Sequence, residues 1–578
     1  MNKIFTLSIT SILALNTICL SSYANTLNYS DSNRIVRLYQ IQNRRVYDFN
    51  KFLKNIYFDS KNYSIRNSID LFFNGKISKE DDWLNIYKLM GIYSRLKYKH
   101  SIVKTLSDLV EIKTDKKEDI PQYKNPEIIK FGQKIEEISK SFGLEYKNID
   151  NRIFEVTLKG SSNEEFGVYT HADVVPVDPS RWVLPDNTKL NPFKLTVIKN
   201  NLYGRGTEDD KCSIVSSLYA MKSIKESNLP IKRTIKLLIE TTEETSGEGI
   251  EYYKERYKVP SHNIVLDSAY PLVIAEKGAG NIILKYDIKD IQGSEPEIID
   301  MTGGLAYNHI PSISIISIKS TNLNELKSII DEKSQIYIKE NGNDFKIESN
   351  IDSNILKLVV TGKSGHSAGP QNAINPVARA SEFIYLLDKE LKFKNNAFKQ
   401  ACFFIAENFG LDYYGKKLNL DYKDDFMGGL TMTPTFIKAK NNELEVVINI
   451  RSPRGKEAEI LKQEIIDKLT DYQNRTNNPF KLTVKVGKYM YRDVKGKWIN
   501  TLLNTYSELT GKEAKPLSIS GTTTAKQLPN GVCFGPTIPN EKYTGHTDNE
   551  FKKMSNFLFD LQIFTEMFLR IGNLESMD

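Results

Sequence analysis

The chain has 578 residues, of which 40% are hydrophobic and 10% aromatic, which is enough apolar material for more than one buried core. Its 79 basic and 72 acidic side chains give a formal net charge of +7 and are spread along the sequence rather than gathered into a basic stripe. These features exclude a disordered tail, argue against nucleic acid as the main partner, and predict two or three domains.

Residues 1–24 have the pattern of a cleaved export signal. Lys3 precedes an apolar stretch that finishes with the small-residue pattern around Ser22 and Ala24. The alternative is a membrane anchor, but Ser, Thr and Asn interrupt the apolar run, which is also short for a span. We therefore expect cleavage after Ala24, a periplasmic or secreted protein, and no stable membrane span in the mature chain.

The next two segments differ in pattern. Residues 25–99 are polar, basic and rich in tyrosine, and their broken helical periodicity predicts a helical extension. In residues 100–279, helices alternate with short apolar strands such as FGVYTHADVV, TIKLLIETT and NIVLDSAYP. This alternation predicts an α/β domain with a doubly wound, mainly parallel sheet.

Residues 280–489 change to a mixture of strands, helices and a hairpin, which predicts an α+β sandwich with an antiparallel sheet. Residues 490–578 return to the earlier type, with a strand at GVCFGP and a long amphipathic helix after it. The simplest architecture is an α/β domain formed by 100–279 and 490–578, with the second domain inserted into it.

Unusual polar residues follow the predicted strands of the α/β domain. In such a sheet, ligands bind beyond the carboxyl ends of the strands, so these side chains can converge in one crevice. They are His171, Asp173, Asp209, Asp210, Glu243, Glu244, Asp267 and His546.

This set contains imidazoles and carboxylates but no thiolate, a mixture that suits Zn²⁺, Mn²⁺ or Co²⁺. Two ions sharing a bridging carboxylate would use the set better than one ion with three protein ligands. Taken singly, each residue also fits a structural histidine, a helix cap or a solvated acidic loop. Their recurrence at successive strand ends favours a two-metal hydrolase.

Glu243 and Glu244 are adjacent, and neighbours on a regular strand point to opposite faces. Both can serve one site only in a turn, and the following Thr245, Ser246 and Gly247 favour one. One carboxylate could then bind a metal ion while the other takes a proton from a metal-bound water.

The chain resembles a known family, the co-catalytic dizinc metallopeptidases. This family includes aminoacylase, carnosinase, glutamate carboxypeptidase and succinyl-diaminopimelate desuccinylase. The resemblance covers residues 100 to 575 and is closest to the dipeptidase V and carnosinase branch. It rests on motifs in the family's order: HADVVPVD, YGRGTEDDK, ETTEETSGEG, LDSAYPLVIAEKG, TGKSGHSAGPQNAINP and GHTDNEF.

The resemblance implies a ligand set for two divalent ions, with Zn²⁺ expected and Mn²⁺ or Co²⁺ as alternatives. Asp209 would bridge the ions. His171 and Asp267 would complete the shell of one ion, and Glu244 and His546 that of the other.

It also implies three catalytic residues. Glu243 matches the family's general base, and Asp173 matches the aspartate that orients the metal-binding His171. His366, in the inserted domain, matches the histidine that polarises the scissile carbonyl.

Four further residues would bind substrate. Asn308 and Arg451 would hold its backbone and carboxylate, and Gly521 and Thr522 lie in a loop that resembles the stretch contacting its terminus. The inserted domain would be a lid or dimerisation domain, which leaves a monomer or a homodimer open. The extension 25–99 has no counterpart in the family core.

The sequence thus predicts an exported, metal-dependent exopeptidase that hydrolyses dipeptides or short peptides through a hydroxide bridging two metals, with Glu243 as general base. Two alternatives stay open: an N-acyl amino acid deacylase or desuccinylase, and a non-catalytic binding protein on the same fold. The expected partner is a small peptide or an N-acyl amino acid, and not nucleic acid.

Overall fold

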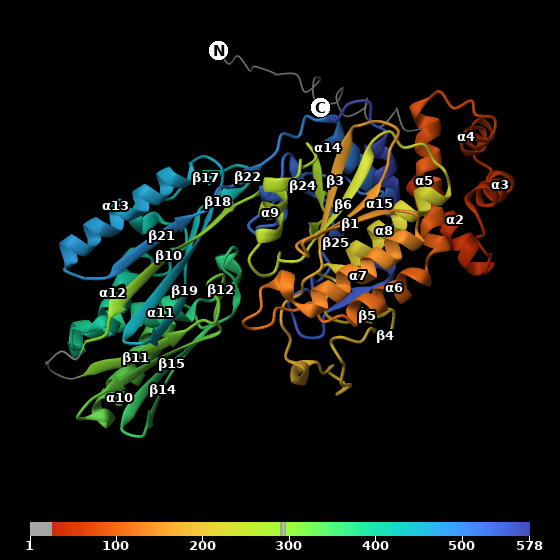
Figure 1. Cartoon of the computed structure of the whole chain (residues 1–578). Coiled ribbons are helices and arrows are strands. Elements are labelled where there is room, and N and C mark those ends of the chain that lie inside the picture. Colours follow the sequence, from red (N-terminus) through yellow and green to blue (C-terminus); the bar gives the residue numbers. More distant parts are fainter. Residues whose placement is uncertain (1–25, 290–292, 294–295) are drawn as a thin grey trace, which may run out of the picture. The chain divides into compact units, whose positions relative to one another are not determined.

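The computed structural model describes residues 26–289, 293 and 296–578 (Figure 1). The expected export signal, residues 1–24, lies outside the described residues. The chain divides into two compact units. The first unit ends at Ile274 and resumes at Arg492–Leu517 and Thr523–Asp578.

The second unit comprises Ala275–Tyr491 and Ser518–Thr522. From the sequence we expected the inserted domain at 280–489 and all of 490–578 in the α/β domain. The short segment Ser518–Thr522 differs from that assignment. Its Ile519 carbonyl accepts a hydrogen bond from the Lys277 N–H at 3.1 Å, a long-range pairing that has no local sequence signal.

The first unit begins with the helices predicted for the N-terminal extension. They are α2 (Tyr29–Ile41), α3 (Phe49–Asp59), α4 (Tyr63–Phe73) and α5 (Glu80–Lys97). Asn28, Asp48 and Asn62 precede the first three, and each side chain accepts a hydrogen bond from a backbone N–H in the first turn. These caps satisfy N–H groups that lack an intrahelical partner, so the sequence itself sets where the helices begin.

The main sheet of the first unit is parallel at its centre and antiparallel at its edges. Seven of its nine strands, in spatial order, are β1 (Glu145–Ile149), β2 (Ile153–Leu158), β6 (Thr234–Glu240), β3 (Glu165–His171), β7 (Asn263–Val265), β24 (Gly531–Cys533) and β9 (Val273–Glu276). The four strands β6, β3, β7 and β24 run parallel. The predicted α/β class is therefore confirmed.

The antiparallel edge at β1 and β2 was not predicted. The two strands form a hairpin, and the central residues of its turn, Asp150 and Asn151, both have positive φ, of 49° and 55°. Two consecutive residues of this kind make the tight turn that matches the twist of a hairpin.

Helices cover both faces of this sheet. They are α6 (Ser101–Val110), α7 (Pro126–Ser141), α8 (Lys211–Glu226), α9 (Glu248–Arg256), α14 (Lys497–Thr510) and α15 (Met554–Gly572). Phe166 of β3 packs against Phe568 of α15, with ring centroids 6.3 Å apart. On the opposite face, the Tyr253 hydroxyl of α9 donates to Glu155 of β2 at 2.7 Å.

A small antiparallel sheet joins two distant parts of the first unit. It consists of β4 (Thr196–Ile198), β5 (Asn201–Tyr203) and β26 (Phe551–Lys553). The pairing of β5 with β26 places the loop after β5, which carries Asp209, beside the loop before β26, which carries His546.

The second unit contains an antiparallel sheet with strand order β14 (Lys346–Asp352), β15 (Ile355–Thr361), β13 (Ile313–Lys319), β11 (Glu297–Gly303), β19 (Thr431–Lys440), β20 (Glu443–Ser452), β10 (Gly278–Asp287) and β21 (Lys481–Val486). Its helices are α10 (Leu323–Asn341), α11 (Pro376–Leu391), α12 (Ala397–Asn408) and α13 (Ala458–Thr476). The alternating burial of Leu356, Leu358 and Val360 along β15 shows that one face of the sheet lies in the core. The predicted α+β fold with an antiparallel sheet is confirmed.

Among the described residues, no helix has the length and apolar character needed to cross a bilayer.

Candidate active site

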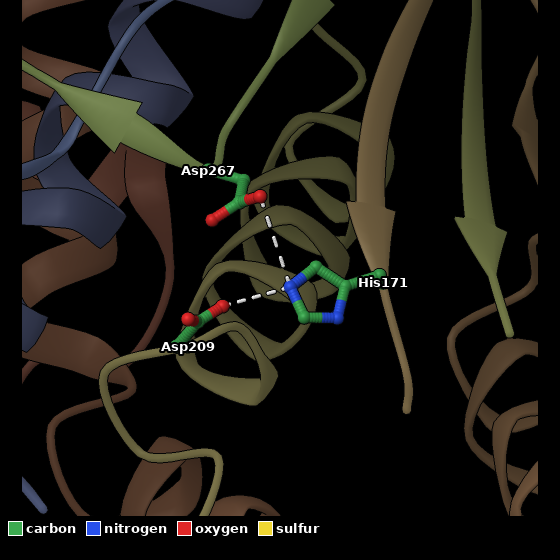
Figure 2. A group of neighbouring side chains, drawn as sticks. All are labelled: His171, Asp209 and Asp267. Atoms are coloured by element: carbon green, nitrogen blue, oxygen red, sulfur yellow. Dashed lines mark hydrogen bonds and ion pairs between the residues drawn. The ribbon is translucent and has the colours of Figure 1, made fainter. Parts of the chain in front are cut away.

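Three predicted ligands meet at the carboxyl ends of the parallel strands. His171 is the last residue of β3, Asp267 lies two residues after β7, and Asp209 lies in the loop before α8. The His171 Nε2 atom is 2.8 Å from Asp209 Oδ1 and 3.8 Å from Asp267 Oδ2 (Figure 2). The ligand atoms of all three lie within 4.8 Å of one another, which is close enough to hold one ion.

A second group forms around the other oxygen of Asp209. His546 Nε2 lies 3.0 Å from Asp209 Oδ2 and 2.6 Å from Glu244 Oε1. His546 has a φ of 61°, in the left-handed region that few residues with a Cβ adopt, and its side chain is half exposed. Asp209 therefore contributes one oxygen to each group, as expected of a bridging carboxylate.

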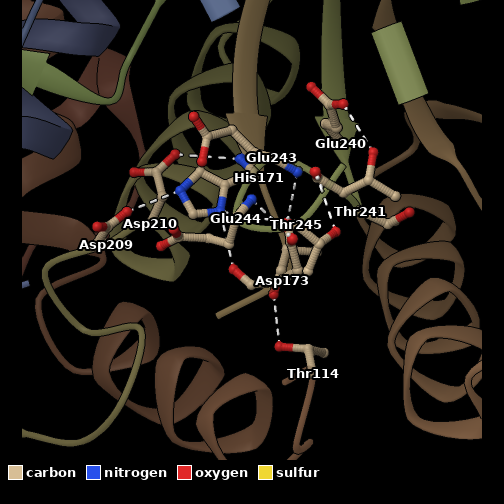
Figure 3. A network of polar contacts seen from close by, with 12 residues as sticks. Thr114, His171, Asp173, Asp209, Asp210, Glu240, Thr241, Glu243, Glu244 and Thr245 are labelled. Atoms are coloured by element: carbon tan, nitrogen blue, oxygen red, sulfur yellow. Dashed lines mark hydrogen bonds and ion pairs between the residues drawn. The ribbon is translucent and has the colours of Figure 1, made fainter. Parts of the chain in front are cut away.

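A third group, His171, Glu243 and Glu244, also has ligand atoms within 4.8 Å of one another, and the sequence analysis did not single it out. The turn between β6 and α9 brings both glutamates to the site. The Asp173 carboxylate accepts the Glu243 N–H at 3.2 Å through Oδ1 and the Glu244 N–H at 3.0 Å through Oδ2 (Figure 3).

Asp173 is the residue expected to orient His171, and both its backbone carbonyl and its carboxylate lie near that imidazole. The His171 Nδ1 atom donates to the backbone carbonyl of Asp173 at 2.9 Å, whereas the Asp173 carboxylate oxygen Oδ1 is 3.6 Å away. The carbonyl fixes the imidazole, and the fully buried carboxylate fixes the turn. Sequence spacing places both residues at the strand end but does not reveal which atom of Asp173 makes the contact.

The other two glutamates around this turn have structural environments. Glu240 is buried, and its Oε1 accepts the Thr242 hydroxyl at 3.0 Å and the Ile250 N–H at 3.3 Å, which stabilises the start of α9. Glu248 lies 3.8 Å from Arg152 with about half of its side chain exposed.

Glu550 is a buried carboxylate that the sequence analysis missed. Its Oε1 accepts the N–H groups of Glu208 at 2.7 Å and Asp209 at 3.1 Å. Its Oε2 accepts the Gly206 N–H at 3.1 Å and the Arg205 guanidinium at 2.6 Å. Four donors on one carboxylate hold the loop that presents Asp209. The sequence placed Glu550 in the motif GHTDNEF, but nothing in the motif indicates this contact.

Tyr543 is a second residue that was missed. Its hydroxyl donates to Asp209 Oδ2, the oxygen that also faces His546. Burial and the charge of Asp209 raise the pKa of Tyr543, so the phenol stays protonated and acts as a donor. Tyrosine is common in this chain, so its position three residues before His546 carried no signal.

The electrostatics of the site fit a divalent cation. Burial and the neighbouring charge of Asp209 raise the pKa of Asp267 well above its usual range. Burial, opposed by His171 and reinforced by Glu244, raises the pKa of Glu243 to about 8. Crowded carboxylates in a buried place are costly unless a cation balances them, and the donor set of imidazole and carboxylate suits Zn²⁺, Mn²⁺ or Co²⁺.

In the second unit, the predicted residues His366, Asn308 and Arg451 belong to one polar cluster. His366 in β16 (Gly365–His366) pairs with His309 in β12 (His309–Ile310). The Ser367 hydroxyl contacts the Asn308 carbonyl at 2.9 Å and Asn449 Oδ1 at 2.7 Å.

Arg451 joins this cluster because its Nε donates to Asn449 Oδ1 at 3.2 Å. Its side chain is buried, with 5% exposed. Gly521 and Thr522 follow β23 (Leu517–Ile519) in the segment Ser518–Thr522. At Gly521 an added Cβ would meet no atom closer than 3.7 Å, so the backbone there does not require a glycine.

The fold and this site define the class of protein. The family model described as peptidase family M20/M25/M40 matches residues 167–570. The chain therefore belongs to this family and is a metallopeptidase, which confirms the resemblance inferred from its motifs.

Two known proteins illustrate the similarity. The beta-Ala-Xaa dipeptidase of Lactobacillus delbrueckii subsp. lactis is 26% identical over 476 residues, which are 81% of this chain and 95% of that protein. The crystal structure of human carnosine dipeptidase 1 is similar in fold, with a TM-score of 0.51 and 16% identity over 85% of this chain and 99% of that one.

Proposed function

We propose that this metallopeptidase is a two-metal dipeptidase, which hydrolyses dipeptides or short peptides from one end. The observation that carries the proposal is that Asp209 contributes one oxygen to each of two ligand groups. The beta-Ala-Xaa dipeptidase supports the substrate class, because the similarity extends over nearly all of its length.

His171, Asp209 and Asp267 would hold one ion, and Asp209, Glu244 and His546 would hold the other. Zn²⁺ suits this donor set, and Mn²⁺ or Co²⁺ would also fit it. When bound, the ions would polarise the scissile carbonyl and lower the pKa of a water molecule.

Glu243 is the proposed general base. It lies beside the proposed ligand Glu244 in the turn held by Asp173, and a carboxylate placed there can accept a proton from a metal-bound water. Glu243 would take the proton of the attacking water and deliver it to the leaving amine.

The polar cluster of the second unit would supply contacts to the substrate. The planar guanidinium of Arg451 would bind the carboxylate at the substrate's end, and Asn308 its backbone. His366 would donate a hydrogen bond to the scissile carbonyl oxygen. Gly521 and Thr522 would contact the substrate's terminus.

Export is a separate part of the proposal. Residues 1–24 would be removed on the way to the periplasm or the medium. Sequencing the N-terminus of the protein recovered from an exporting host tests this, and a chain that still begins at Met1 would contradict it.

The substrate class is tested by assaying a dipeptide panel against an N-acyl amino acid panel, with Zn²⁺ or Mn²⁺ added. We expect hydrolysis of dipeptides that is abolished by a chelator and restored by the metal. Faster hydrolysis of the N-acyl panel would instead identify a deacylase. No turnover of either panel by wild-type protein shown to contain two ions would indicate a binding protein.

A further inference from the structure

The net charge of the chain is concentrated in the N-terminal helices. Residues 26–79 contain ten basic and four acidic side chains, whereas residues 80–578 contain 68 of each sign. The expectation that the charge is spread along the sequence is therefore wrong for residues 26–79. Residues 26–79 carry a net charge of +6, whereas residues 80–578 have no net charge. This difference indicates that residues 26–79 contact an acidic partner.

The same segment exposes an unusual share of the aromatic side chains. Among the described residues, nine tyrosine or phenylalanine side chains are exposed to solvent, and five of these lie in residues 26–79. Single exposed apolar residues are normal on a protein surface, but a concentration of them marks a contact site. The five are Tyr29, Tyr47, Phe58, Tyr63 and Phe73.

Helix α3 has two faces of different character. Its inner face is packed into the helical extension through Phe49, Phe52, Leu53 and Ile56. The rings of Phe49 and Phe52 both contact Tyr93 of α5, at 5.4 and 5.8 Å between centroids. Helix α3 therefore makes its core contacts through its inner face, and its outer face makes none of these contacts.

The outer side carries what we call the α3 face, formed by Tyr47, Lys51, Lys54, Phe58 and Phe73. Lys51, Lys54 and Phe58 have the spacing of one helix face, and all three are exposed. The Lys51 Nζ lies 4.5 Å from the Tyr47 ring centroid, and the Lys54 Nζ lies 5.8 Å from that of Phe73. Phe58 is 82% exposed.

We propose that the α3 face docks the protein on an anionic phospholipid bilayer. A helix with apolar rings and lysines on one side lies in the plane of such a surface, where the rings enter the boundary of the acyl chains and the ammonium groups meet the lipid phosphates. This docking is peripheral and requires no membrane-spanning helix.

Nucleic acid offers the same phosphate charge but fits this face less well. Stacking of bases needs open ring faces. One face each of the Tyr47 and Phe73 rings already contacts a lysine ammonium group. Phe58 and Phe73 also have no hydrogen-bonding group with which to read a base.

The proposal is tested by sedimentation with vesicles of phosphatidylcholine alone or mixed with phosphatidylglycerol. The full chain is used as recovered from its host, and every variant is made in that same chain, so that any contribution of residues 1–25 is common to all. We expect binding to the anionic vesicles that weakens at high salt. The double variant K51E/K54E should bind about tenfold more weakly or worse, and Phe58→Ser several-fold more weakly.

Two matched variants serve as controls. K130E/K468E changes the net charge by the same amount at exposed lysines on α7 and α13, and Ile460→Ser removes an exposed apolar side chain from α13. Both should bind vesicles like the wild type. Circular dichroism checks that each variant folds.

Three outcomes would overturn the proposal. The first is no difference between the anionic and the neutral vesicles. The second is an equal loss of binding in K51E/K54E and in K130E/K468E. The third is binding to single-stranded DNA as tight as to vesicles, together with unchanged vesicle binding by Phe58→Ser.

Discussion

At the scale of single residues, the candidate site depends on buried carboxylates that are not among the proposed metal ligands. Glu550 receives two N–H groups on one oxygen, and an N–H and the Arg205 guanidinium on the other. Asp173 receives the N–H groups of Glu243 and Glu244. Each carboxylate fixes a loop whose own residues are proposed ligands, so it would affect metal binding through the backbone.

Replacing Glu550 by Gln tests this for the Asp209 loop. The amide keeps the shape of the side chain but has only one acceptor oxygen, so at least one N–H of the loop loses its partner and the Arg205 charge is unpaired. We expect metal affinity to fall by about tenfold to a hundredfold, the usual effect of removing a group that orients a ligand. Titration with Zn²⁺ measures this directly. Wild-type affinity in a folded Glu550→Gln protein would contradict the role of Glu550.

The adjacent glutamates should separate in their effects. Glu243→Gln removes the proposed base and should lower kcat by about a hundredfold or more while both ions stay bound. Glu244→Gln removes a ligand and should reduce the bound metal. Metal analysis of the two purified variants, beside their kcat values, distinguishes them. A Glu243→Gln enzyme that retains wild-type kcat would exclude Glu243 as the base.

At the scale of elements, helix α5 joins the N-terminal helices to the rest of the first unit. Its Lys88 Nζ lies 2.8 Å from Glu508 of α14 and 2.7 Å from the Leu27 carbonyl. Glu508 also pairs with Arg570 of α15 at 2.6 Å. These side chains are largely buried, so the ion pairs hold the extension in place.

Replacing Lys88 by Met leaves the two buried acceptors without this partner. Removing one member of a buried ion pair typically lowers the free energy of unfolding by about 3 kcal/mol. Thermal denaturation followed by circular dichroism should show a lower Tm. The exposed Lys54→Met variant is the matched control and should melt like the wild type. Equal melting temperatures for the two variants would show that the Lys88 contacts contribute little.

The elements also show what the sequence can and cannot predict. Strand and helix alternation predicted the parallel sheet, and the pattern with a hairpin predicted the antiparallel one. Asn28, Asp48 and Asn62 act as the helix caps that their residue types favour. The antiparallel β1–β2 edge and the placement of Ser518–Thr522 depend on long-range hydrogen bonds, for which no local pattern exists. The ligand set could be listed from strand ends and motifs, whereas the contacts of Glu550 and Tyr543 required the fold.

At the scale of the whole molecule, residues far apart in sequence meet at one edge of a parallel sheet. Residues 167 to 267 supply most of the site, and His546 and Glu550 return almost three hundred residues later. The pairing of β5 with β26 accounts for that return, because it places the two loops side by side. In the sequence, most of the second unit, Ala275–Tyr491, is inserted between these two strands.

The central claim is that two ions share Asp209, and metal stoichiometry tests it most directly. Elemental analysis of the purified protein after loading with Zn²⁺ should give two ions per chain for the wild type. Asp267→Asn should lose one ion, because Asp267 belongs only to the group with His171 and Asp209. Asp209→Asn should lose both, because Asp209 belongs to that group and also to the group with Glu244 and His546. One ion per wild-type chain, or two ions retained by Asp209→Asn, would contradict the account.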